Sequence, residues 1–217
     1  MVFEIDKDIL LKSVLVSDSV ISSKNMNTVL GNCLFEVKNN TLSITGTDND
    51  IAIRNNVDIS SNSIFSFTLN GKKLVQILKE LPKGNIVIDV DNNYMTSIKS
   101  KEIKGIYKLL GTSSEEFPSI KEIQSENMIE FDQNIFKELI RNVIYAASTD
   151  SVKPSFNGIF LITEKKKQLS SVASDSRRLS LCSRPIDTDI EIKDGIIIPL
   201  KTIQEIQKIL TTGNAFL

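Results

Sequence analysis

The stretch Phe3-Glu4-Ile5-Asp6-Lys7-Asp8-Ile9-Leu10 is matched 126 residues later by Ile129-Glu130-Phe131-Asp132-Gln133-Asn134-Ile135-Phe136. Each copy begins with alternating apolar and polar residues, the pattern of a half-buried strand. Asp6 and Asp132 then stand where a helix N-cap is expected, because an aspartate side chain accepts hydrogen bonds from the first free backbone N–H groups of a helix. An amphipathic helical pattern follows in both copies. The sequence therefore predicts a strand, a cap and a helix that occur twice.

The repeat extends along most of the chain. Three further segments recur in the same order, with shifts that drift only from 126 to 129 residues: Asn32–Phe35 on Gly158–Leu161, Leu42–Asp48 on Leu169–Asp175, and 74–84 on 203–213. Self-similarity of this kind marks a repeated structural unit. Strand patterns outnumber helical ones, which are expected at 7–17, 70–81, 133–147 and 200–211. The sequence predicts an α+β fold of tandem modules, with antiparallel sheets on one side and two helices per module packed on one face.

The boundary between the copies is expected near 117–127, a stretch with proline, serine and several charges. We therefore expect one module over 1–123 and a second over 124–217. The first copy continues past Gly84 with strand patterns at 85–90, 95–99 and 105–110, whereas the second ends within the equivalent of the first of these. The second module is accordingly expected to lack its last strands.

Composition excludes several kinds of site. The chain has no histidine, the commonest general base and transition-metal ligand, and it has no glycine-rich phosphate loop or paired cysteine motif. Asp89–Asn93 starts like a calcium loop but continues with Tyr94 where glycine is needed, so a turn is expected there. Cys33 and Cys182 are isolated and are expected to be buried free thiols in a reducing cytoplasm. We expect no enzyme, no cofactor, no metal site and no membrane partner.

Charge is unevenly distributed. The net charge is −1, but the four predicted helices hold nine basic and four acidic residues, which leaves −6 for the rest. Lysine is a good helix former, so exposed faces rich in lysine are one explanation. A basic surface that binds phosphates without reading base sequence is the other. Under the second explanation the candidate residues are Lys72, Lys73, Lys79, Lys137, Arg141, Lys201 and Lys208.

A second candidate site lies in the run Ala173–Cys182, where Arg177 and Arg178 follow the end of a predicted strand. Two adjacent arginines either decorate the surface or rim a pocket that receives a peptide carboxylate or backbone carbonyl.

Five motifs together resemble the bacterial sliding clamp family, the beta subunits of DNA polymerase III. They are Leu30-Gly31-Asn32, Leu42–Asp48, Glu116-Phe117-Pro118, Asn157-Gly158 and the Ala-x-Asp-x-x-Arg-Leu run from Ala173 to Leu179, of which the last is specific to the family. The resemblance covers the whole chain in order. It implies a DNA-clamp fold and a three-domain subunit that forms a head-to-tail homodimer, a ring around double-stranded DNA with helices lining the hole. The third domain would be absent here, so this chain alone is not expected to close a ring.

The resemblance also implies site residues. Lys24 and Lys153, on two loops, join the helix lysines as expected DNA contacts. Short peptide motifs of the replicative DNA polymerase and of clamp-loader subunits are expected in a pocket formed by Phe156, Ser174, Ser176, Arg177, Arg178 and Leu179. Many family members have Gly-His where this chain has Ser176-Arg177, which leaves peptide specificity open. The rival interpretations are a β-rich repeat protein that assembles without DNA and an enzyme with carboxylate chemistry.

Overall fold

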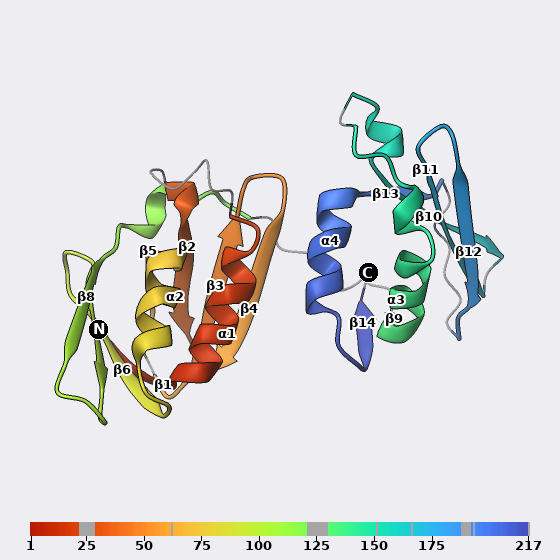
Figure 1. The fold of residues 1–217 in the computed structure, drawn as a ribbon. Coiled ribbons are helices and arrows are strands. Elements are labelled where there is room, and N and C mark those ends of the chain that lie inside the picture. Colours follow the sequence, from red (N-terminus) through yellow and green to blue (C-terminus); the bar gives the residue numbers. More distant parts are fainter. Residues whose placement is uncertain are drawn as a thin grey trace. The chain divides into compact units, whose positions relative to one another are not determined.

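The chain divides into two compact units, Met1–Lys121 and Glu122–Leu217, each of which is described by itself (Figure 1). The structure is a computed structural model that describes residues 1–21, 29–61, 63–120, 130–150, 152–165, 167–187, 192 and 194–216. Among these residues no helix is long and apolar enough to cross a membrane.

The first unit consists of two four-stranded antiparallel sheets and two helices. Its elements are β1 (Val2–Asp6), α1 (Lys7–Asp18), β2 (Asn32–Lys38), β3 (Thr41–Thr47), β4 (Ala52–Asp58), β5 (Phe65–Asn70), α2 (Gly71–Glu80), β6 (Asn85–Val90), β7 (Met95–Ser100) and β8 (Ile106–Leu110). The strand orders are β1-β6-β7-β8 and β4-β3-β2-β5. Helices α1 and α2 pack side by side against the sheets, and Leu10, Leu74 and Phe35 lie fully buried between the layers.

The second unit repeats this order. Its elements are β9 (Glu130–Asp132), α3 (Gln133–Arg141), β10 (Gly158–Lys165), β11 (Gln168–Ser174), β12 (Leu179–Pro185), β13 (Ile196–Pro199), α4 (Leu200–Ile209) and β14 (Asn214–Phe216). The sheet β12-β11-β10-β13 has the topology of β4-β3-β2-β5. Asn214 lies opposite Asp132 just as Asn85 lies opposite Asp6. The predicted repeat and the α+β fold are therefore confirmed.

The predicted caps and turns form as expected. The Asp6 carboxylate accepts hydrogen bonds from the backbone N–H groups of Asp8 and Ile9, and Asp132 accepts one from Asn134. Asn39 and Asn40 both have positive φ at the hairpin tip between β2 and β3, as asparagine tolerates. The segment after Asp89 is a turn between β6 and β7, in which the carboxylate of Asp91 accepts backbone bonds. Both cysteines are free and buried.

One helix is shorter than predicted. Helix α3 ends at Arg141 rather than at 147, and a 3-10 helix (η5, Ile144–Ala146) follows it. The helix ends early because of tertiary contacts made by Asn142. Its backbone N–H caps the end of α3. Its side-chain amide donates to the Cys182 sulfur, and its backbone carbonyl accepts from the Ser180 hydroxyl. These ties to β12 turn the chain so that Val143 becomes fully buried.

The charge count of the helices also changes. The side chain of Lys7 is only 9% exposed and its ammonium lies 2.5 Å from the Asp8 carboxylate, so Lys7 adds no basic surface. Helix α1 extends to Asp18, one residue further than predicted. With that bound the four helices hold nine basic and five acidic residues. The basic excess remains, but α1 no longer contributes to it.

Asp18 packs against the start of α2. A Cβ placed on Gly71 would lie 2.5 Å from one carboxylate oxygen of Asp18, and among the described residues that oxygen has no hydrogen-bond partner. Burial raises the pKa of the Asp18 carboxyl above its ordinary value, against the opposing attraction of Lys72. The folded protein thus holds the proton more tightly than the unfolded chain does.

Asp18→Asn is expected to stabilise the protein more at neutral than at acidic pH. A raised pKa in the folded state means that the free energy of unfolding falls as pH rises above the ordinary carboxyl value of about 4. The amide does not titrate and escapes this loss. Urea unfolding of both proteins between about pH 4.5 and 7.5 measures the difference, which should grow with pH. A difference that is constant or shrinks with pH would contradict the assignment.

Candidate functional site

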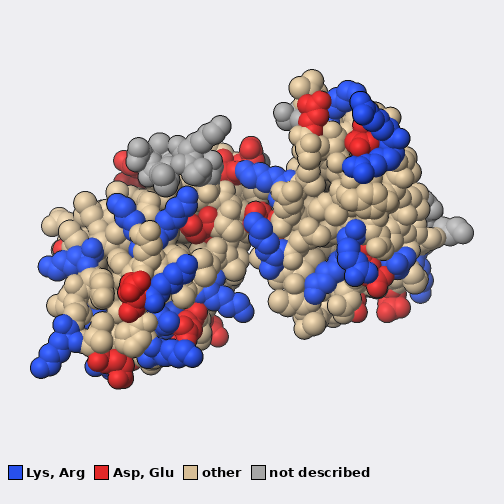
Figure 2. Space-filling model, in the orientation of Figure 1, with Lys and Arg blue, Asp and Glu red and all other residues tan. Residues whose placement is uncertain are grey.

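Basic side chains gather on the helix-bearing face of the first unit. On α2, Lys73 and Lys79 are exposed, whereas Lys72 is half-buried beside Asp18. Figure 2 shows Lys and Arg side chains over this face, with acidic side chains between them. The face is thus mixed rather than uniformly basic, and α2 provides most of its positive charge.

In the second unit a hollow of about 390 Å³ opens on the helix face. It is lined by Asn134, Lys137, Glu138, Arg141 and Gln207, which come from α3 and α4. The Lys137 ammonium donates a hydrogen bond to the Thr211 carbonyl just beyond α4, so it stabilises that helix end. Glu138 is held by Arg184 of β12, with 2.6 Å between guanidinium nitrogen and carboxylate oxygen. Arg141 is exposed at the rim and is the residue of this hollow best placed for a phosphate.

The remaining predicted DNA contacts are spread out. Lys208 is paired with Glu205 at 2.7 Å, one turn earlier on α4, and Lys201 is exposed at the start of that helix. Lys153 is exposed, and its ammonium lies 5.9 Å from the centre of the Phe156 ring. Lys24 lies outside the described residues.

The turn that follows β11 is built by its own side chains. The Ser174 hydroxyl accepts from the backbone N–H of Ser176 at 3.2 Å and donates to the Arg178 carbonyl at 2.8 Å. One Asp175 oxygen accepts the backbone N–H groups of Arg177 and Arg178, both at 3.0 Å. These bonds hold Ser176 at a φ of +73°, where a glycine would be less strained.

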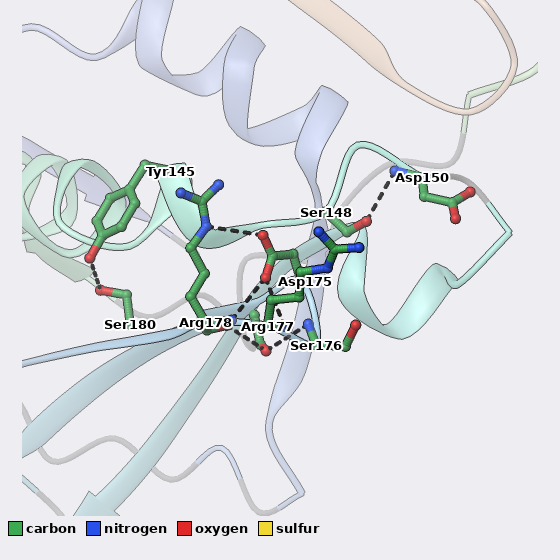
Figure 3. Close-up of polar contacts among 9 residues, drawn as sticks. Tyr145, Ser148, Asp150, Asp175, Ser176, Arg177, Arg178 and Ser180 are labelled. Atoms are coloured by element: carbon green, nitrogen blue, oxygen red, sulfur yellow. Dashed lines mark hydrogen bonds and ion pairs between the residues drawn. The ribbon is translucent and has the colours of Figure 1, made fainter.

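Asp175 and Tyr145 position Arg178. The guanidinium Nε donates to the second Asp175 oxygen at 3.0 Å, and the group lies 5.7 Å from the centre of the Tyr145 ring. The Tyr145 hydroxyl in turn donates to Ser180 at 3.2 Å (Figure 3). Hydrogen bonds lower the pKa of Asp175 below its ordinary value, and the bond from the backbone N–H of Arg177 has the largest effect. The Asp175 carboxylate therefore stays charged beside Arg178. Arg178 is therefore held in one place on the tyrosine face.

A second hollow, of about 460 Å³, adjoins this turn. It is lined by Ile144, Tyr145, Ala147, Ser148, Thr149, Asp175, Arg178, Leu200 and Gln204. Of the six predicted pocket residues only Arg178 lines it. Leu179 is 67% exposed at the start of the edge strand β12, and Ser174, Ser176 and Arg177 form the adjoining turn. Phe156, half-buried in a neighbouring 3-10 helix, is tied to the hollow because its carbonyl accepts from the Ser148 backbone N–H.

Sequence reasoning missed the residues that shape this hollow, above all Tyr145, Leu200 and Gln204. No sequence pattern indicated Tyr145, because it falls inside the predicted helix 133–147 and its 60% exposure is known only from the structure. Tyr145 lies beside Arg178 because β12 runs past the end of α3, and no local sequence pattern predicts that packing.

Two family models match consecutive parts of the chain. The model of the DNA polymerase III beta subunit N-terminal domain matches residues 1–121, and that of the central domain of the same subunit matches residues 130–216. Among curated proteins, the beta sliding clamp of Bacillus subtilis is 29% identical over 97% of this chain, and that of Halalkalibacterium halodurans is 28% identical over all of it.

Solved structures agree. The Bacillus subtilis DNA polymerase sliding clamp matches all of this chain with a TM-score of 0.90 at 28% identity, and a Pseudomonas aeruginosa DNA polymerase III beta subunit matches it with 0.91 at 27%. A Pseudomonas aeruginosa sliding clamp bound to griselimycin matches with 0.89 at 27%. The chain spans only 57% to 59% of the length of the two curated relatives and 58% to 59% of these solved chains.

Proposed function

The chain belongs to the family of the bacterial DNA polymerase III beta subunit, and we propose that it forms the first domain and part of the second domain of a ring-shaped processivity factor. In this proposal the ring encircles double-stranded DNA without sequence specificity, in the cytoplasm, and tethers the replicative polymerase rather than catalysing a reaction. The observation that carries the proposal is the match of the whole chain, in order, to sliding clamps.

The helix faces support contact with DNA. Phosphate contacts by lysine and arginine give affinity without reading bases, and the basic residues here stand on exposed helix faces. The residues we propose are Lys72, Lys73, Lys79, Arg141, Lys153, Lys201 and Lys208, with Lys137 in a mainly structural position and Lys24 outside the described residues. A mixed, moderately charged face suits a ring that slides, because tight phosphate binding would hold it in place.

The edge of the first sheet supports assembly. β8 is the last strand in its sheet, and Ile106 and Leu110 on it are 58% and 65% exposed. An edge strand with apolar side chains is a template for pairing with another chain. We propose that this edge contributes to a head-to-tail homodimer, in which unlike surfaces of two subunits meet and the rotation closes a ring.

The hollow beside Arg178 supports peptide binding. It combines an apolar floor from Ile144, Ala147 and Leu200 with a fixed arginine and an exposed tyrosine, a combination common in peptide-binding pockets. We propose that it receives short peptide motifs of the replicative polymerase and of clamp-loader subunits.

The decisive experiment measures retention on DNA of different topology. The complete protein that contains this chain, loaded on a nicked circular DNA, should remain bound at high salt, because encirclement does not depend on phosphate contacts. Cutting the circle once should release it, and bulky blocks on both ends of the cut DNA should restore retention. Equal release from circular and linear DNA would contradict the proposal and favour a repeat protein that does not encircle DNA.

A further inference from the structure

The two units differ in how their helices meet. In the first unit α1 and α2 pack against each other, whereas α3 and α4 of the second unit stand apart, and Figure 1 shows both arrangements. The first residue of α2 permits the close approach, because a Cβ on Gly71 would lie 2.5 Å from an oxygen of Asp18 at the end of α1. Leu200 begins α4 in the place of Gly71, and the bulk of its half-buried side chain keeps α4 away from α3.

The hollow of about 390 Å³ between α3 and α4 results from this separation, and two of its charged residues already have partners. The Glu138 carboxylate is held by Arg184 of β12 at 2.6 Å, which compensates its negative charge. The Lys137 ammonium donates to the Thr211 carbonyl, but it keeps its positive charge beside the hollow. The lining therefore carries two positive charges, and its one negative charge is neutralised by a residue from outside the lining.

Arg141 and Gln207 line the hollow from opposite walls. The bond from Lys137 to Thr211 joins the first half of α3 to the segment just after α4, so the two helices run in opposite directions. Gln207 lies one turn before Thr211, and Arg141 lies one turn after Lys137, which places these two side chains across the hollow from each other.

Both side chains have hydrogen-bond donors to offer. Arg141 and Gln207 are exposed, and within the part of the chain that the structure describes their side chains make no ion pair or hydrogen bond. A guanidinium has five N–H donors in a fixed plane, and a side-chain amide has two more. The hollow thus presents unused donors from both walls and a positive charge with no nearby acid free to compensate it.

We propose that this hollow is a discrete site for one phosphate group, which Arg141 and Gln207 bind from opposite walls. The guanidinium can donate two parallel N–H bonds to phosphate oxygens, and the amide N–H adds a third. The phosphate can belong to the backbone of double-stranded DNA or to a free phosphate ester. The inference rests on the proposed contact with DNA for the first of these sources only, and it does not require a closed ring.

The test titrates the ¹⁵N-labelled chain with inorganic phosphate while chloride keeps the ionic strength constant. NMR signals of the Gln207 side-chain amide and of the Arg141 Nε–H group are expected to shift and to saturate at about millimolar phosphate. Acetate at the same ionic strength is expected to bind more weakly, because a carboxylate has fewer acceptor oxygens than a phosphate. Shifts that do not saturate, or acetate that binds as tightly as phosphate, would overturn the inference.

Variants locate the effect. Arg141→Gln should weaken phosphate binding by about tenfold or more, and Arg141→Lys should keep part of the affinity, because an ammonium retains the charge but not the two parallel bonds. Lys167→Gln removes one exposed positive charge from the same unit outside the hollow and should leave the affinity unchanged. Phosphate affinity that survives Arg141→Gln would place the site elsewhere and refute the assignment.

A short DNA duplex distinguishes the two sources of phosphate. A duplex that displaces inorganic phosphate from the Arg141 signal assigns the site to the DNA backbone, and phosphate binding without competition from the duplex assigns it to a free phosphate ester. Retention of the complete protein on circular DNA is a separate measurement, because encirclement does not depend on this hollow. Failure of the phosphate site is therefore distinguishable from failure of the proposed function.

Discussion

Gly46→Ala is expected to lower the free energy of unfolding by about 3 kcal/mol or more, a large effect for the addition of one methyl group. Gly46 lies in β3 directly under the last turn of α1, and a Cβ there would overlap the backbone carbonyl oxygen of Ser17. Ser17 is fully buried and its hydroxyl donates to the Ile44 carbonyl at 2.8 Å. The end of α1 would have to move away from the sheet, which would break this bond and loosen Val14 in the core.

Two controls separate this clash from a general effect of alanine. Gly105→Ala, in the turn before β8, adds a Cβ whose nearest contact is the Ile103 side chain at 3.8 Å, and should be nearly neutral. Ala173→Gly changes the equivalent position of the second unit and should cost about 1 to 2 kcal/mol, through backbone entropy and the loss of a buried methyl group. Urea unfolding with circular dichroism measures all three. A Gly46→Ala variant as stable as Gly105→Ala would show that α1 can shift without loss.

The same comparison explains why the two copies differ. Ala173 takes the place of Gly46 in the second copy, and α3 ends at Arg141, whereas α1 continues to Asp18. The position equivalent to Ser17 is Val143, which lies two residues beyond the end of α3, and the second copy has room for the Ala173 Cβ. The repeat was readable because strand alternation and N-caps such as Asp6 are local patterns. The end of α3 could not be predicted in this way, because it depends on hydrogen bonds between Asn142 and the residues Cys182 and Ser180, which are about 40 residues away.

The candidate sites were predictable only in part, for the same reason. Counting charges on predicted helices identified Lys73, Lys79 and Arg141, which are exposed. It could not tell that Lys7 is buried against Asp8 or that the Lys137 ammonium caps the end of α4. The position of a lysine in the sequence predicts which face of a helix it occupies. Whether its ammonium group is free for a ligand depends on the neighbouring segments that it contacts in the folded chain.

For the pocket, the adjacent residues Arg177 and Arg178 correctly indicated the turn that borders it, but they did not predict the geometry of that turn. The hollow is assembled from the 3-10 helix η5, the loop 147–149, the turn after β11 and the start of α4. Three of these four segments carry no unusual residue pattern. Asp175 was part of the quoted motif, yet only the structure places its carboxylate between the backbone of Arg177 and the guanidinium of Arg178.

Replacing Arg178 and Leu179 together by alanine is expected to weaken binding of a partner peptide by about a hundredfold in the complete protein. An arginine at the centre of an interface often costs about 2 kcal/mol or more when truncated, which is about thirtyfold, and the loss of leucine burial adds to it. Arg178 lines the hollow beside Tyr145, and its loss also leaves the Asp175 carboxylate without its partner. Leu179 is 67% exposed in the free chain, so a peptide that covers it gains apolar burial.

A matched pair on the same strand provides the control. Arg184→Ala with Leu181→Ala removes the same two residue types from β12, but Arg184 is paired with Glu138 and neither residue lines the hollow. This variant should bind the peptide within about twofold of the unaltered protein, since rim and remote contacts contribute little. Fluorescence anisotropy with a labelled peptide of the replicative polymerase measures both variants. If the Arg178 and Leu179 variant binds as tightly as the control, the peptide must bind elsewhere, because Arg178 is the predicted pocket residue that lines this hollow.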